Sequence, residues 1–287
     1  MTYKTFAKTA ALAVISVVLC LIVLTAATFA WFSSNRKVET SRIEARTGSA
    51  DVRLLLSGYS ADFSESSATI VQVNSENREN LLPVSTVDLV TFVYNPVTAE
   101  GMASYFEEVP NEEHIFHGRI YMLAEATGDQ PGTALAVYLD ESTASGGVLV
   151  TKDDDQADAS IVNASRLGLV FGGKSVILRV TEDENEQAAQ VRNTVVDGVL
   201  LEDGKVLTSS GGRIIAADDP SVPLSRYTVN ADSNSAVLPV EPLFELELNR
   251  VYPLDIYFYI EGCDPDCSDN IKLLDTNLHI ALYGVLK

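Results

Sequence analysis

The sequence is poor in basic residues, cysteine and histidine. Its 287 residues include 20 Lys and Arg against 40 Asp and Glu, for a formal net charge of -20. This shortage of cations excludes a nucleic-acid binder, because such proteins take their affinity from Lys and Arg on phosphate groups. With 3 Cys and 3 His, there is little material for a metal cluster. The hydrophobic share of 46% is too high for a disordered acidic tail, so we expect a folded protein.

The longest uncharged stretch lies near the N-terminus. Residues 10–32 read AALAVISVVLCLIVLTAATFAWF, and Lys4 and Lys8 precede them. The stretch exceeds the roughly 7 to 15 apolar residues of a signal-peptide core and fits a bilayer span of about 20. Small residues near its end also predict signal-peptidase cleavage after Ala27 or Ala30. Residues 1–32 are therefore predicted to be either a cleaved signal peptide or a transmembrane anchor of an exported protein.

The exported part shows the period-two alternation of β-strands. Apolar residues alternate in FELEL from Phe244, LDIYFYI from Leu254 and LHIALY from Leu278. Asp-Gly and Gly-Gly pairs from 197, 203 and 211 lie between short apolar runs, as in hairpins. Other β-rich runs are ADVRLLLS from Ala50, ATIVQV from Ala68, LVTFVY from Leu89, ALAVYLD from Ala134, RLGLVF from Arg166 and SVILRV from Ser175. The pattern predicts an all-β, antiparallel sandwich or barrel.

The domain organisation follows from the same pattern. We expect residues 33–47 to form a linker or N-terminal arm and residues 48–287 to form a single β-sandwich with loop insertions. The polar stretch 151–160 predicts a loop, and the stretch 218–235 predicts either a loop or a linker into a C-terminal subdomain. One short helix is expected at ENEQAAQVR from Glu184.

The segment CDPDC follows the strand that is predicted to end at Ile260. Two exported cysteines, Cys263 and Cys267, predict a disulfide that fixes the shape of a loop, whereas a metal site would need further soft ligands. The acidic residues of the loop predict either a weak calcium site or a solvated acidic loop without EF-hand spacing. These residues are Asp264, Asp266 and Asp269. No other cofactor is expected.

Recognisable catalytic motifs are absent from the sequence. The segment NEEHIFHGRI lacks the His-Glu-x-x-His order of a zinc protease, and neither a nucleophile elbow nor a phosphate loop is present. We therefore predict a protein that is not an enzyme. The alternative is a surface module that binds polysaccharide or peptide, or a hydrolase with a carboxylate pair, because two carboxyls at the right separation cannot be identified from sequence.

Both ends of the chain resemble known exported proteins. The strings TAATFAWFSSNRKVE and RTGSADVRLLLS resemble the N-terminal signature of Gram-positive proteins of the TasA and camelysin type. IYFYIEGCDPDCSDN resembles a motif in uncharacterised exported proteins of related bacteria. The resemblance implies a jelly-roll-like β-sandwich, cleaved by a signal peptidase and deposited at the cell surface or in a biofilm matrix, in some cases as fibres.

The resemblance also implies a mode of assembly. Fibres of this type grow when an N-terminal segment of one subunit completes the sheet of the next. The corresponding donor candidates in this chain are Trp31, Val38, Ile43, Val52 and Leu54. The expected function is therefore contact with further copies or with other surface proteins. An anchored sensor or scaffold domain is a third interpretation.

Overall fold

The computed structural model describes most of residues 38–287. The described residues are 38–58, 60–63, 68–73, 81–94, 97–98, 101–102, 107–109, 114–128, 132–143, 147–152, 160–180, 195–196, 199–200, 205–207, 213–215, 220–233, 238–239, 241–262, 264, 267 and 276–287. The apolar segment 10–32, the cleavage sites Ala27 and Ala30, and the helix expected from Glu184 lie outside them. No helix within these ranges has the length and apolar character needed to span a membrane.

Most described strands belong to two sheets of seven strands each. Sheet A contains β1 (Val38–Thr47), β3 (Ile70–Val73), β10 (Ala134–Asp140), β11 (Val148–Lys152), β19 (Thr228–Val229), β20 (Phe244–Glu247) and β22 (Thr276–Leu286). Sheet B contains β2 (Val52–Ser57), β4 (Pro83–Val84), β9 (Phe116–Ala126), β12 (Ser165–Phe171), β13 (Lys174–Arg179), β18 (Val222–Pro223) and β21 (Val251–Glu261).

The remaining described elements are short. Two-stranded ladders join β5 (Val93–Tyr94) to β8 (Glu107–Glu108), β6 (Val97–Thr98) to β7 (Gly101–Met102), β14 (Val195–Val196) to β15 (Val199–Leu200), and β16 (Lys205–Leu207) to β17 (Arg213–Ile215). The helical elements are α2 (Ser160–Ala164) and the 3₁₀ turn η2 (Leu224–Arg226).

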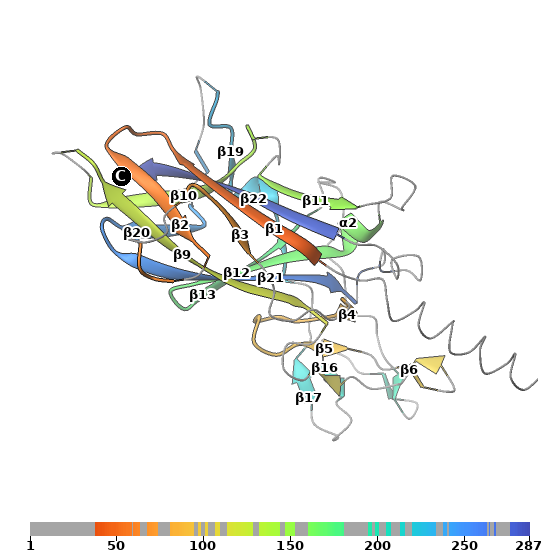
Figure 1. The fold of residues 1–287 in the computed structure, drawn as a ribbon. Helices are drawn as coiled ribbons and strands as arrows, with labels where there is room; N and C mark the ends of the chain where they lie inside the picture. The colour runs from red at the N-terminus through yellow and green to blue at the C-terminus, as the bar shows by residue number, and fades with distance from the viewer. Residues whose placement is uncertain are drawn as a thin grey trace, which may run out of the picture.

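The two sheets pack face to face, with the main hydrophobic core between them. The core takes Ile43 from sheet A and Leu54 and Ile256 from sheet B. Figure 1 shows β1 beside β22 in one layer and β12 beside β21 in the other. The alternation of inward and outward residues, as along β9, turns an apolar face of each sheet toward this core. The predicted all-β class is confirmed.

The sheets are mixed, which corrects the prediction of a purely antiparallel sandwich. β12 pairs antiparallel with β13, and β21 pairs antiparallel with β9. However, β1 runs parallel to β22, and the short strands β4, β18 and β19 run parallel to β21, β13 and β10. These parallel partners are far apart in the sequence, so no tight turn forces them to run antiparallel.

Most runs predicted from alternation are strands, but the run from Leu89 begins as a turn. Leu89 has a positive φ of 58°. The Asp88 carboxylate accepts hydrogen bonds from the N–H groups of Val90 and Thr91, both at 2.9 Å. These hydrogen bonds to the Asp88 side chain take the place of hydrogen bonds to a neighbouring strand. They keep the backbone out of the extended conformation. Only Val93–Tyr94 of the run is a strand.

The sandwich begins earlier than the sequence analysis places it. Residues 38–47 belong to the predicted linker or arm, yet they form β1 inside sheet A. The stretch 218–235 contains β18 and β19, which pair with strands of sheets B and A. The strands β20, β21 and β22 after this stretch pair with earlier strands of both sheets, so the two sides share one core.

Candidate functional site

The strand β1 is an interior strand of sheet A. It runs parallel to β22, with Ile43 opposite Ile280 and Arg46 opposite Tyr283. On its other side it runs antiparallel to β3, where Ile43 lies opposite Val71. β1 is therefore hydrogen-bonded along both sides although it is the first strand of the described chain.

Alternate side chains of β1 enter the core. Ile43 is fully buried and Ala45 is 6% exposed, and both belong to the main core. Because side chains alternate along a strand, Arg42, Glu44 and Arg46 lie on the outer face. β1 thus fills an apolar slot between β22 and β3 with one large and one small side chain.

A tight connection joins β1 to β2 in the other sheet. The Thr47 hydroxyl donates to the Val52 carbonyl oxygen at 2.8 Å, and the Gly48 N–H donates to the Gly284 carbonyl oxygen at 3.0 Å. A Cβ at position 48 would lie 2.2 Å from the Tyr283 hydroxyl oxygen, so a larger residue there would require the Tyr283 side chain to move. Within the described residues, this connection is the only covalent link between β1 and the sandwich.

The predicted donor segment spans two strands in different sheets. Ile43 lies in β1, whereas Val52 and Leu54 lie in β2, where each is 1% exposed and packs in the core from sheet B. Val38 is the first residue of β1, and Trp31 lies outside the described residues. Of the predicted apolar positions, Ile43 is the one whose side chain is seen in the slot between β22 and β3.

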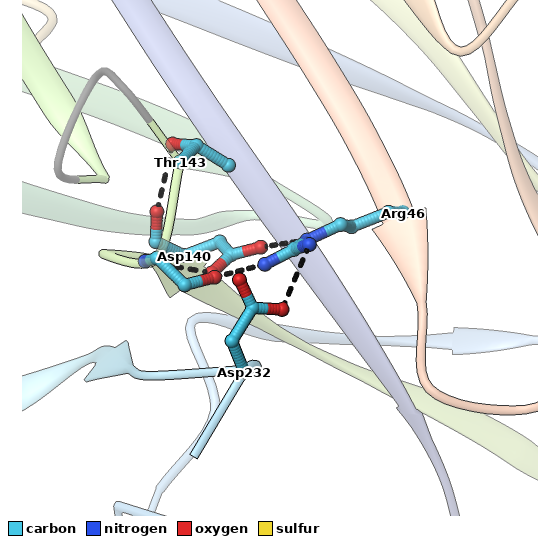
Figure 2. A network of polar contacts seen from close by, with 5 residues as sticks. Arg46, Asp140, Thr143 and Asp232 are labelled. Atoms are coloured by element: carbon cyan, nitrogen blue, oxygen red, sulfur yellow. Dashed lines mark hydrogen bonds and ion pairs between the residues drawn. The ribbon is translucent and has the colours of Figure 1, made fainter.

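On the outer face, the Arg46 side chain reaches across β22 to the end of β10 (Figure 2). Its guanidinium donates to the Asp140 carboxylate and the Ser142 hydroxyl, and to the Asp232 carboxylate at 3.3 Å. It also lies over the Tyr283 ring, with Cζ 5.9 Å from the ring centroid. We call Asp140, Ser142, Asp232 and Tyr283 the Arg46 pocket.

Asp140 is the buried member of the pocket. Its side chain has 0% exposure, against 41% for Arg46. The hydroxyl and the N–H of Ser142 donate to its carboxylate at 2.6 and 3.1 Å. The Thr143 hydroxyl donates to its carbonyl oxygen at 3.0 Å. Burial acts to raise the pKa of Asp140, but hydrogen bonds from Arg46 and Ser142 outweigh it and hold that pKa below its ordinary value.

Two of the predicted disulfide and calcium residues, Asp264 and Cys267, are described, and they follow the end of β21. Asp264 has a side-chain exposure of 3%, and its carboxylate accepts a hydrogen bond from Arg166 at 2.5 Å. The Cys267 N–H donates to the Asp264 carbonyl oxygen at 3.0 Å. Three of the predicted residues lie outside the described ones: Cys263, Asp266 and Asp269. The disulfide and the calcium site therefore stay predictions.

Arg166 holds this loop from within the fold, and the sequence analysis did not single it out. It is fully buried, and its guanidinium also donates to the carbonyl oxygens of Asn163 and Ser165 at 2.7 and 3.0 Å. The available signal was an arginine inside the apolar run RLGLVF. A buried arginine needs a compensating acidic partner, although the sequence does not say which one.

The two histidines of NEEHIFHGRI lie in extended and turn structure, not in a helix. His117 lies in β9, where its ring stacks on Tyr257 with centroids 4.4 Å apart and its Nε2 lies 3.3 Å from the Asp255 carboxylate. His114 lies in a turn with φ of 69°. In the part of the chain that the structure describes, no three His, Cys, Asp or Glu side chains are grouped as a metal site.

The chain was compared with protein-family models, with curated proteins and with solved structures, and nothing matched.

Proposed function

We propose that this chain is a non-enzymatic, exported or surface-anchored protein that acts through protein contacts, as a subunit of an extracellular matrix or fibre. In this proposal, residues 10–32 form a helix that serves as signal peptide or anchor, and the sandwich is jelly-roll-like. The observation that carries the proposal is β1, which pairs with β22 and β3 and places Ile43 and Ala45 in the core between the sheets.

A strand in this position can be supplied by another molecule. In this proposal β1 separates from β22 and β3, which exposes the edges of these two strands and the slot for Ile43 and Ala45. The same strand from a second copy would restore the same backbone hydrogen bonds and bury the same apolar surface. Exchange of an identical element between copies therefore costs few contacts.

The negative charge of the protein favours one specific contact between copies over non-specific association of their surfaces. A formal net charge of -20 makes copies repel one another. Exposed large hydrophobic residues are scattered among the described residues: Ile70, Val90 and Leu238. Assembly then needs a contact that buries apolar side chains in a fixed register, and strand exchange is such a contact.

The proposal is tested by refolding an equimolar mixture of isotopically heavy and light full-length chains in detergent, followed by crosslinking and intact mass spectrometry. We expect crosslinked oligomers that contain both isotopic forms. Monomers alone at every protein concentration would contradict the proposal. In the native host, we expect a mature chain that begins at Thr28 or Trp31; a full-length chain found only in membranes would instead indicate a tethered domain.

A further inference from the structure

Arg46 fixes the position of β1 along β22. Arg46 lies opposite Tyr283, and Tyr283 lies opposite Tyr138 of β10. Asp140 follows Tyr138 by two residues and so lies on the same face of β10. A slip of β1 by two residues, about 7 Å along the sheet, would carry the guanidinium away from Asp140. A slip by one residue would turn Arg46 toward the core.

The Arg46 pocket comes entirely from elements other than β1. Asp140 and Ser142 lie at the end of β10 and in the turn after it, Asp232 follows β19, and Tyr283 lies in β22. Ser142 donates to the Asp140 carboxylate from within the same turn, so the carboxylate is held in place without help from β1. If β1 leaves, however, the Asp140 carboxylate loses the guanidinium that compensates its charge, and the free energy of the protein rises.

The pocket suits arginine better than lysine. The Arg46 guanidinium donates from Nε to Asp140, from Nη2 to Ser142 and from Nη1 to Asp232. These donors diverge from one planar group, and the Tyr283 ring lies beneath it. A lysine ammonium is a single compact charge and cannot reproduce a planar fork of three nitrogens.

We propose that the Arg46 pocket is a guanidinium-recognition site that selects the strand accepted between β22 and β3. The recognised sequence is Ile-x-Ala-Arg, as in 43–46, with the two apolar residues inward and the arginine outward. The occupant is β1 of a second copy of this chain, because this segment carries the side chains that fit the slot and the pocket. The inference rests on the proposed function, which it deepens by naming what is recognised.

A charge swap tests the inference on full-length chains. R46D and D140R each place like charges together within one chain, whereas R46D/D140R restores an opposite pair in the same molecule. In a mixture of R46D with D140R, exchange of β1 pairs opposite charges in both subunits. The aspartate at position 46 of one chain meets the arginine at position 140 of the other, and the Arg46 of the second chain meets the Asp140 of the first. We expect about tenfold or more mixed dimer relative to a mixture of R42D with D140R, a ratio that corresponds to ~1.4 kcal/mol. Arg42 is the matched control because it lies on the same face of β1 and pairs within the strand to Glu44, with N···O at 3.2 Å.

A second test leaves Asp140 unchanged, because an arginine at this buried position can prevent folding. Heavy wild-type chain is mixed with light R46Q, R46K or R42Q, and circular dichroism checks that each variant is folded. We expect both Arg46 variants to give fewer mixed dimers than R42Q. Equal yields from all three would overturn strand selection by the pocket. The absence of mixed dimers even between heavy and light wild type would overturn the proposed function instead.

Discussion

Two ion pairs hold different kinds of chain segment in this protein. Arg166 and Asp264 are both buried, and they fix a loop to the strand β12 inside the sandwich. Arg46 and Asp140 join the first described strand to the end of β10, and the arginine side chain is 41% exposed. The first pair lies inside the fold, whereas the second lies on the strand that we propose is exchanged between copies. A fully buried pair is expected to act on stability alone, whereas in our proposal the half-exposed pair also selects the strand that is accepted.

The largest expected effect comes from breaking the fully buried pair. Arg166→Met leaves the Asp264 carboxylate buried without its cation, which we expect to lower the free energy of unfolding by about 3–5 kcal/mol. The double variant Arg166→Met/Asp264→Leu should recover much of this loss, because neither charge is then left alone. Urea unfolding measures both. Arg250→Ala, at an exposed pair, is the control, and an equal loss there would contradict the assignment.

The next effect concerns the apolar slot of β1. Ile43→Ala removes a fully buried side chain, and we expect a loss of about 2–4 kcal/mol in the free energy of unfolding. Ile70→Ala, on the neighbouring strand β3, changes a side chain that is 47% exposed and should cost well under about 1 kcal/mol. Similar losses for the two variants, measured by urea unfolding, would show that β1 is not packed in the core.

A smaller effect is expected at the Arg46 pocket. Arg46→Gln removes the cation from Asp140, but the exposed guanidinium is partly screened by water, so we expect a loss of about 1–2 kcal/mol. Arg42→Gln should change stability by less than about 0.5 kcal/mol, because its pair with Glu44 is local and exposed. Thermal unfolding in dilute solution separates the two variants. A loss at Arg46 no larger than at Arg42 would remove the basis for a pocket.

The smallest effect is the pH dependence of the same pocket. The pKa of Asp140 is lower in the folded protein than its ordinary value, so ionised Asp140 stabilises the fold above about pH 3.9. This stability is lost as the pH falls through the lower folded pKa. We therefore expect the advantage of wild type over Asp140→Asn in the free energy of unfolding to shrink below about pH 4. An advantage that is constant down to acid pH would contradict the assignment.

Alternation predicted the strands β20, β21 and β22, but it predicted neither β1 nor the contacts that hold it. Strands such as β20 and β21 turn alternate apolar side chains toward the core, and this alternation is visible in the sequence as period two. β1 carries charged residues on its outer face, and Ile43 is its one large inward side chain among those described. Its sequence is therefore typical of a linker. The partners of Arg46 and Arg166 lie 94 and 98 positions away. Only the folded arrangement brings such residues together.

The most direct test of exchangeable β1 is a site-specific crosslink. Glu44 lies on the outer face of β1 opposite Ala281 of β22, and its side chain is 29% exposed, so position 44 can carry a photo-crosslinking residue next to β22. Light chains that carry the crosslinker are refolded together with heavy chains that lack it, irradiated and digested. We predict crosslinks from light β1 to heavy peptides that contain 276–286. Crosslinks confined to light peptides of the same chain, at every concentration, would contradict the account.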